Sequence, residues 1–395
     1  MAPKIAELSG AVAAVEEPDL LRGLGELGMV RGVELVPHGV SVRVALPAEV
    51  WPARNELKRR IDEALVQLVG DDEVRVEMPV MSDDERTELL DRLRSAAAGE
   101  PSPIAPGRSH PAHRSPGAAP GPLEPSEGSP NRFISPGSRT RVLGISSGKG
   151  GVGKSAVSVN LAVALAAAGH EVGLLDADVY GYSVPKMLGV DRDPATIGSL
   201  LVPPVVHGVR CLSMGLFVPD EQPVIWRGPM LHKALEQFLV DAYWGEPDYL
   251  LLDMPPGTGD VALSLGQYLP RAEVLVVTTP QAAAQRVAQR SALAARRLKL
   301  AVRGVIENLS WFTGDDGKRY ELFGAGGGQL LAQSLEVPLL GRIPLGPAVR
   351  VGCDEGVPVR VSDPTSEAAA AFDSLAEAVV NLGPARVYRS ELTVR

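Results

Sequence analysis

Residues 148–155 read Gly148-Lys149-Gly150-Gly151-Val152-Gly153-Lys154-Ser155. The apolar segment 141–146 precedes this run and predicts a strand, whereas residues 156–165 after it predict a helix. Glycines placed between a strand and a helix let the backbone approach an anion closely, and the start of the helix supplies positive potential. The stretch therefore predicts a phosphate-binding loop, all eight residues of which are expected to contact a nucleotide.

The two lysines of the loop have different expected roles. Lys154 places a positive charge near the β- and γ-phosphates, and the hydroxyl of Ser155 is placed to ligate Mg²⁺. Lys149 is not required by the loop itself, so its side chain is expected to reach a phosphate bound to a second subunit, as an arginine finger does. The alternative for Lys149 is a solvated surface lysine.

After residue 141, strand-like and helix-like segments alternate along the chain. Apolar runs at 172–175, 249–252, 274–277, 302–306 and 339–341 predict strands, and residues 230–243, 283–298 and 367–381 predict helices. Continuous apolar runs are typical of strands that are buried on both faces of a parallel sheet. The alternation predicts an α/β fold with a doubly wound, mostly parallel sheet, whose ligands bind at the carboxyl ends of the strands.

Acidic residues stand at those carboxyl ends. Asp253 is expected to hold Mg²⁺ through a water, Asp178 to position the attacking water, and Asp176 to support them. A helix cap is the alternative for each. The glycine-rich residues 257–259 predict a switch that responds to the γ-phosphate. Asn308, after the strand at 302–306, is expected to contact the adenine edge, with a turn residue as the alternative.

Composition limits the remaining possibilities. The chain has 395 residues, a formal net charge of −9 and two cysteines, Cys211 and Cys353. Two distant cysteines exclude a disulfide framework and favour a reducing compartment. The acidic balance argues against nucleic acid or an acidic membrane as a partner. No signal-like or membrane-spanning run is present, so the sequence predicts a cytoplasmic protein.

A change in composition divides the chain. Residues 99–140 are rich in Pro, Gly and Ser and predict a disordered linker. Residues 1–98 before it predict a small α/β domain with a hairpin at 32–44, and residues 141–385 predict the P-loop domain, followed by a tail at 386–395.

A set of short motifs resembles the Mrp/ApbC group of iron–sulfur carrier ATPases. Besides residues 148–155, the set comprises residues 176–181, 183–185, 226–230, 253–260, 278–281 and 307–310. The resemblance implies a homodimer that encloses two ATP molecules with Mg²⁺, with Lys149 acting across the interface. It also implies an iron–sulfur cluster that is handed to apoproteins as clients. Residues 1–98 resemble a small domain associated with iron–sulfur assembly, although Trp51-Pro52 stands where that domain commonly has Cys-Pro.

The sequence departs from the Mrp/ApbC pattern where the cluster ligands belong. The family places a Cys-x-x-Cys pair after the segment matching 307–310, so that two subunits supply four thiolates. Residues 311–320 contain no cysteine. Cys211 and Cys353 are the remaining candidates for cluster ligands, and the alternative for both is a small buried apolar residue.

Three functional hypotheses follow. The first is an ATPase of iron–sulfur cluster assembly, which either carries the cluster or assists its transfer as a helper without one. The second is a positioning ATPase like MinD or ParA, a class that usually adds a basic amphipathic tail, which residues 384–391 do not supply. The third is a small-molecule kinase or amide ligase, for which no substrate-pocket residues argue.

Overall fold

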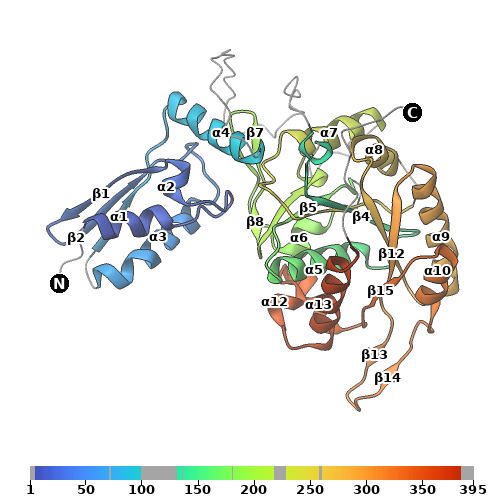
Figure 1. Ribbon diagram of the computed structural model, residues 1–395. Helices are drawn as coiled ribbons and strands as arrows, with labels where there is room; N and C mark the ends of the chain where they lie inside the picture. The colour runs from blue at the N-terminus through green and yellow to red at the C-terminus, as the bar shows by residue number, and fades with distance from the viewer. Residues whose placement is uncertain are drawn as a thin grey trace. The chain divides into compact units, whose positions relative to one another are not determined.

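The computed structural model describes residues 5–70, 73–98, 131–135, 137–179, 181–217, 228–257 and 260–383 (Figure 1). They fall into two units. Unit 1 contains the described residues up to Ala98 together with segments 192–204 and 241–245, and unit 2 contains the other described residues. The expected tail at 386–395, most of the expected linker, and Thr258 and Gly259 of the expected switch lie outside the described residues.

Unit 2 is built on an eight-stranded sheet in the order β15-β12-β11-β4-β10-β5-β9-β8. The strands are β4 (Arg141–Ser147), β5 (Val172–Asp176), β8 (Val205–Val206), β9 (Val209–Ser213), β10 (Tyr249–Asp253), β11 (Glu273–Thr278), β12 (Ala301–Glu307) and β15 (Leu339–Arg342). All neighbouring pairs are parallel except β8 with β9 at one edge. The predicted doubly wound, mostly parallel sheet is confirmed.

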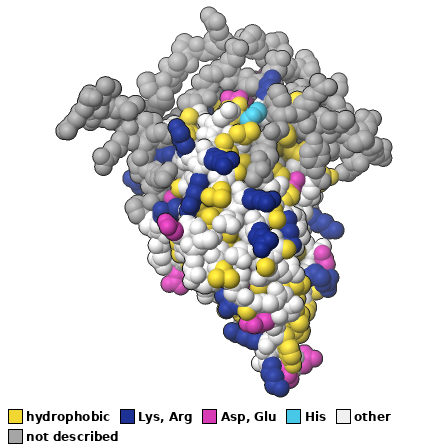
Figure 2. Space-filling view, turned by 90° about the vertical axis from the view of Figure 1, so that its right-hand side faces the viewer, with side chains coloured by type: hydrophobic (Ala, Val, Ile, Leu, Met, Phe, Trp, Pro, Cys, Tyr) yellow, Lys and Arg dark blue, Asp and Glu magenta, His cyan; other side chains and the backbone are white. Residues whose placement is uncertain are grey.

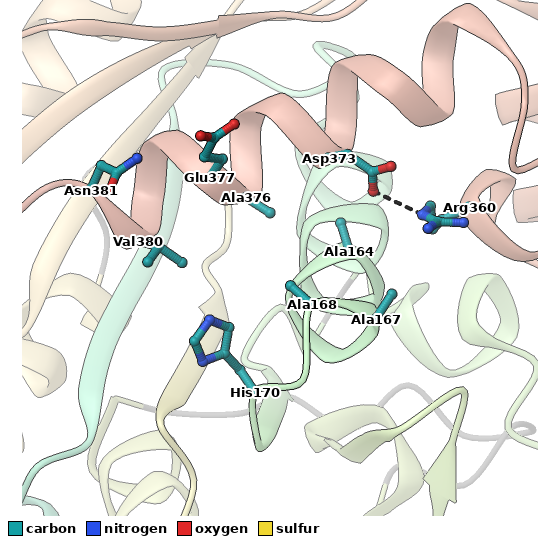
Figure 3. Close-up of a pocket in the computed structure, with 10 residues that line it drawn as sticks. All are labelled: Ala164, Ala167, Ala168, His170, Arg360, Asp373, Ala376, Glu377, Val380 and Asn381. Carbon is teal, nitrogen blue, oxygen red and sulfur yellow. Dashed lines mark hydrogen bonds and ion pairs between the residues drawn. The ribbon is translucent and has the colours of Figure 1, made fainter.

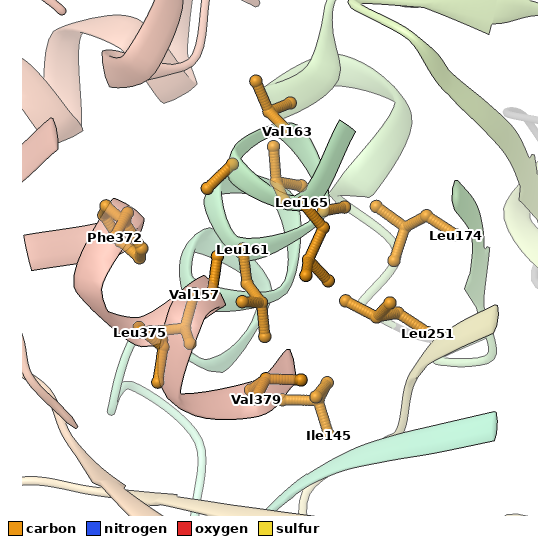
Figure 4. Close-up of a cluster of buried hydrophobic side chains, with 14 of the residues drawn as sticks. Ile145, Val157, Leu161, Val163, Leu165, Leu174, Leu251, Phe372, Leu375 and Val379 are labelled. Carbon is orange, nitrogen blue, oxygen red and sulfur yellow. The ribbon is translucent and has the colours of Figure 1, made fainter. Parts of the chain in front are cut away.

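The alternation of side chains along β4 separates two helical layers. Leu143 and Ile145 belong to the core formed with α5 (Lys154–Ala167) and α13 (Glu367–Val380). Figure 4 shows this core, with the labelled side chains of the two helices converging on those of β4, β5 and β10. Ser146 points the other way and its Oγ lies 3.0 Å from Oγ of Ser291, which lies on α9 (Ala282–Arg297). Helices therefore cover both faces, as the near-continuous apolar strands require.

Unit 2 contains further helices besides α5, α9 and α13. They are α6 (Val184–Leu188), α7 (Gly228–Val240), α8 (Asp260–Tyr268), α10 (Gly327–Leu335), α11 (Pro347–Glu355) and α12 (Val359–Ser362), with a 3-10 turn at Met214–Phe217. Within the described part of the chain, no helix has the length and apolar character that crossing a bilayer requires.

Two details of unit 2 differ from the sequence prediction. The pattern did not predict β9, because Arg210 is buried within it and interrupts the apolar run. Helix α7 ends at Val240 rather than near residue 243. Beyond it, the carbonyl of Asp241 accepts from the amide of Leu201, and the amide of Tyr243 donates to the carbonyl of Leu201. Extended pairing thus replaces the last helical turn.

Unit 1 contains a three-stranded sheet in the order β1-β2-β3. Its elements are α1 (Ile5–Ala14), α2 (Leu24–Leu27), β1 (Val30–Val36), β2 (Gly39–Val44), α3 (Arg54–Val69), β3 (Glu73–Glu77) and α4 (Asp83–Ala98). Strands β1 and β2 are antiparallel, which confirms the predicted hairpin, and β3 joins β2 in parallel. The predicted small α/β domain is present in these residues.

The core of unit 1 also includes residues from later in the chain. Strands β6 (Ala195–Ile197) and β7 (Leu200–Val202) form an antiparallel hairpin. Ala195, Ile197, Val202 and Tyr243 belong to the same buried cluster as the apolar residues of α1 to α4. Arg192 donates to Asp19 across 2.6 Å. This part of unit 1 could not be predicted from residues 1–98.

The C-terminal end of the expected linker has defined structure. Residues Arg132–Ile134 form a 3-10 turn, and Phe133 is buried. The side-chain amide of Asn131 donates to the carbonyl of Tyr268. The expectation of disorder up to residue 140 is therefore wrong for 131–135, because one aromatic residue finds a packing site there.

Candidate functional site

The loop at 148–155 connects β4 to α5 and has the conformation that its glycines permit. Gly151 and Gly153 have φ angles of 80° and 77°, which favour glycine. A Cβ on Gly150 or Gly151 would meet nothing within 4 Å, so this side of the backbone is open to an approaching anion. An open backbone beside the N-terminus of α5 is the arrangement that phosphate binding requires, and the contact of the loop with a nucleotide stays a prediction.

Gly148 is required for a different reason. A Cβ on Gly148 would lie 2.2 Å from the backbone nitrogen of Ala288 and 2.3 Å from the backbone carbon of Val287. Helix α9 therefore passes directly against the first residue of the loop. The absence of a side chain at this position sets how closely the loop and α9 pack.

Lys154, Ser155 and Asp253 converge at the end of β10. The Lys154 ammonium and the Ser155 hydroxyl both donate to Oδ2 of Asp253, over 2.5 and 2.6 Å. Asp253 has no exposed surface and Lys154 is 7% exposed. A carboxylate beside a hydroxyl forms a set of hard oxygen donors of the kind that Mg²⁺ prefers, so these residues fit the expected metal.

Two serines that the sequence analysis did not select also contact the aspartates. The hydroxyl of Ser158 donates to Oδ1 of Asp253 over 2.5 Å, and that of Ser213 donates to Oδ2 of Asp176 over 3.2 Å. Both serines are fully buried. Helical spacing could have revealed Ser158, because positions 154, 155 and 158 share one face of α5. No local pattern indicates Ser213, because β9 was not predicted.

Asp176 lies beside Asp253, because β5 and β10 pair in register at these two residues. Its carboxylate accepts from the backbone amides of Asp178, Ser183 and Val184. Burial, and then the nearby Asp253, raise the pKa of Asp176 to about 7. Asp176 thus anchors the chain from β5 to the start of α6, consistent with the expected supporting role.

Asp178 lies within the turn that follows Asp176 and is half-buried. Its Oδ1 accepts from the backbone amide of Gly181 over 3.1 Å. This contact closes a turn and does not cap a helix, because α6 begins at Val184 and its N-cap is Ser183. The turn begins at the same edge of the sheet as Asp253, which is compatible with a role in positioning water. That role stays a proposal.

Asn308 contacts the phosphate-binding loop directly. Its side-chain amide donates to the carbonyl of Val152 over 2.9 Å, and it lies against the Cα of Gly153. The neighbouring Glu307 is fully buried and accepts from Ser310, Gly328 and Arg342, which fixes the end of β12. Asn308 therefore supports the loop, and a contact with adenine stays a prediction.

Lys149 is half-buried at the rim of the loop. Its side chain has no hydrogen bond or ion pair with any other residue that the structure describes, whereas the Lys154 ammonium is bonded to Asp253. The two lysines thus have different surroundings, as the sequence predicts. The trans role of Lys149 stays a prediction.

The face over α9 and α10 carries many cations. Figure 2 shows Lys and Arg side chains there with hydrophobic ones between them. Helix α9 contains four arginines and no acidic residue. By contrast, arginines on α3 and α4 pair with acids on their own helix. This face is locally basic in a chain of net charge −9.

The two cysteines are free and buried. Cys211 lies in β9 and is 1% exposed, whereas Cys353 lies in α11 and receives a contact from the amide of Asn160 at 3.8 Å. Burial raises the pKa of both thiols. A cluster ligand has to be a thiolate, so neither side chain fits a cluster in this arrangement. Among the described residues, no group of three or more His, Cys, Asp or Glu is arranged to hold a metal.

Residues 311–320, where the resemblance led us to expect a cysteine pair, form a short β-ribbon. Strands β13 (Phe312–Thr313) and β14 (Arg319–Tyr320) are antiparallel. Glu367, at the start of α13, accepts from Trp311, Thr313 and Arg319 and fastens the ribbon. The guanidinium of Arg319 also stacks 4.4 Å from the ring of Trp311. Side-chain contacts therefore hold this segment.

A cavity of about 370 Å³ lies at the far end of α5 (Figure 3). Its floor is formed by alanines of α5 and α13, and Arg360 and Asp373 pair at its rim over 2.8 Å. Its lining residues on the α5 side run from Ala164 to Ala168, and α5 rises about 1.5 Å per residue, so the cavity begins about 15 Å from Lys154. It is separate from the phosphate-binding loop.

Comparisons with known proteins identify the family. The family model described as NUBPL iron-transfer P-loop NTPase, in the ParA group, matches residues 138–380. The iron-sulfur cluster carrier protein of Mycobacterium leprae is 44% identical over 359 residues, 89% of this chain and 86% of that protein. A protein of the same name from Synechocystis is 37% identical over 372 residues, 92% of this chain and 94% of that protein.

Among solved structures, a nucleotide-binding protein of Archaeoglobus fulgidus in complex with ADP is similar at a TM-score of 0.50 and 32% identity. The alignment covers 59% of this chain and 93% of that one. The sequence relatives align well beyond residues 138–380, so their similarity extends into unit 1. The motifs, the sheet and these matches agree, and the chain belongs to the iron-transfer P-loop NTPase family.

Proposed function

We propose that this protein hydrolyses ATP to drive a step of iron–sulfur cluster assembly, in which clusters are transferred to apoproteins. The observation that carries the proposal is the convergence of Lys154, Ser155 and Asp253 under an open phosphate cradle. The named relatives supply the iron–sulfur context, because they are called iron-sulfur cluster carrier proteins and align over most of the chain. We further propose a cytoplasmic homodimer.

The residues of the site have distinct roles in the proposed reaction. Ser155 and Asp253 would hold Mg²⁺, which when bound supplies positive charge to the phosphates. Lys154 neutralises charge on the β- and γ-phosphates, and the loop amides orient them for in-line attack. Asp178 positions the attacking water. Asn308 holds the loop and, in the proposal, borders the adenine.

Lys149 is proposed to act on the nucleotide of the other subunit, and mixing variants tests this. The Lys149→Ala protein should still bind ATP but hydrolyse it at least about 10³-fold more slowly. The Asp178→Ala protein should also be inactive, yet it retains Lys149. A mixture should recover up to about a quarter of wild-type turnover, because half of the randomly formed dimers then contain one complete site. No recovery on mixing would place the action of Lys149 within its own subunit.

The chemistry of the thiols favours the helper form of the function. Cys211 and Cys353 are the only cysteines of the chain, and burial raises the pKa of both. The ribbon at 311–320 offers no thiolate in their place. We therefore propose that the nucleotide cycle assists transfer of a cluster that is ligated chiefly by other proteins.

Anaerobic reconstitution separates the helper from the carrier. Iron, sulfide and visible absorbance are measured on the wild-type protein and on the Cys211→Ser/Cys353→Ser variant. The helper form predicts no stoichiometric cluster on either protein, with ATP hydrolysis intact. A cluster on the wild type that the double variant loses would make this protein a carrier through its buried thiols.

A further inference from the structure

Helix α5 directs a third polar side chain at Asp253, besides those of Lys154 and Ser155. Ser158 Oγ lies 2.5 Å from Oδ1 of Asp253 and 3.0 Å from the carbonyl oxygen of Lys154. A hydroxyl has one proton to donate. The carboxylate oxygen is both closer and charged, so it is the stronger acceptor of that proton.

The two oxygens of the Asp253 carboxylate have different hydrogen-bond partners. Oδ2 faces Ser155 and Lys154, whereas Oδ1 is held by Ser158. The terminal torsion of an aspartate has a broad preference, so nothing intrinsic to Asp253 selects this orientation. Ser158 and Asp253 have no exposed surface, which leaves bulk water no access to replace the donor.

We propose that Ser158 is a positioning residue, whose hydroxyl fixes the Asp253 carboxylate so that Oδ2 is presented to the Mg²⁺–nucleotide site. Ser158 itself touches neither nucleotide nor metal in this proposal. The inference rests on the proposed assignment of Ser155 and Asp253 to that site. It does not depend on the iron–sulfur role.

The proposal predicts a loss that is specific to the metal. In Ser158→Ala, Asp253 loses a charge-assisted hydrogen bond in a buried site, which should weaken Mg²⁺-dependent nucleotide binding by about ten-fold. Binding measured in EDTA should be unchanged, because the loop amides and Lys154 remain. A serine that merely stabilised α5 would shift both affinities together.

The experiment titrates a fluorescent ATP analogue against the full-length protein at a series of Mg²⁺ concentrations and in EDTA. Ser374→Ala is the control for removing a helical serine hydroxyl, because the exposed Ser374 donates to the carbonyl of Ala370, four residues earlier. If Ser158→Ala does not fold, Ser158→Cys replaces it, since a thiol fills the space but donates weakly.

The outcomes separate the two proposals. A higher Mg²⁺ requirement in the Ser158 variant alone supports the positioning role. If wild-type binding depends on Mg²⁺ and the Ser158 variant shows the same dependence, the positioning role is wrong and the nucleotide site stands. If wild-type nucleotide binding does not depend on Mg²⁺, the assignment of Ser155 and Asp253 to a Mg²⁺ site is wrong, and the positioning role of Ser158 is wrong with it.

Discussion

Replacing Gly148 by alanine should force apart the phosphate-binding loop and α9. The added Cβ would lie 2.2 Å from the nitrogen of Ala288, whereas ordinary contact begins at 3.4 Å, so one of the two segments has to move by about 1.2 Å. Overpacking of this kind typically costs about 1–3 kcal/mol. For a domain of this size, each kcal/mol lowers the melting temperature by about 2–4 °C. The nearest atoms are backbone, so no side chain can simply rotate away.

Gly150→Ala is the control, because it lies in the same loop and its Cβ would meet nothing within 4 Å. Neither Gly148 nor Gly150 has a positive φ, so the pair differs in contact rather than in backbone conformation. Thermal unfolding without nucleotide should show Gly148→Ala melting at least about 2 °C lower, with Gly150→Ala within about 0.5 kcal/mol of the wild type. Equal melting temperatures for the two variants would refute the argument from close packing.

Three further predictions concern both units. Ile197→Ala should destabilise unit 1 by about 2–5 kcal/mol, because Ile197 is fully buried there. Amide hydrogen exchange in β1 to β3 should become faster. The control is Thr196→Ala, which replaces the exposed neighbouring residue and should leave the exchange rates unchanged. Burial, and then Asp19, raise the pKa of Glu17 to about 7 from an ordinary 4.5. The folded state therefore holds this proton more tightly, and up to about 3 kcal/mol of stability present below pH 4.5 should be lost as the pH rises through 7. The melting temperature of Glu17→Gln should not show this fall with pH. The same fall of melting temperature with pH in the variant and the wild type would contradict the assignment. Asn308→Ala should weaken ATP binding about five-fold through loss of the bond to Val152, as calorimetry would show, and an unaltered affinity would remove Asn308 from the site.

Local patterns in the sequence were sufficient for the phosphate-binding loop, the strands that flank it, and the aspartates at the strand ends. Each of these depends on residues close together in the chain: glycines before a helix, apolar runs of strand length, and an acid at the end of a run. Lys154, Ser155 and Asp253 meet because parallel strands bring their carboxyl ends to one edge. Local patterns, together with the rule that parallel strands end at one edge of the sheet, were therefore enough to predict where the site lies.

Contacts between distant segments were decided only by the tertiary structure. In the sequence Ser158 is one of several serines, and only the packing of α5 against β10 brings it to Asp253. Ser213 lies on β9, which was not predicted because the buried Arg210 interrupts its apolar run. The hairpin around Ile197 joins a core about 100 residues earlier in the chain, because apolar burial does not depend on sequence separation. The burial that raises the thiol pKa values likewise depends on what packs around each cysteine. Periodicity reports which face of an element is apolar, but not which distant element will cover it.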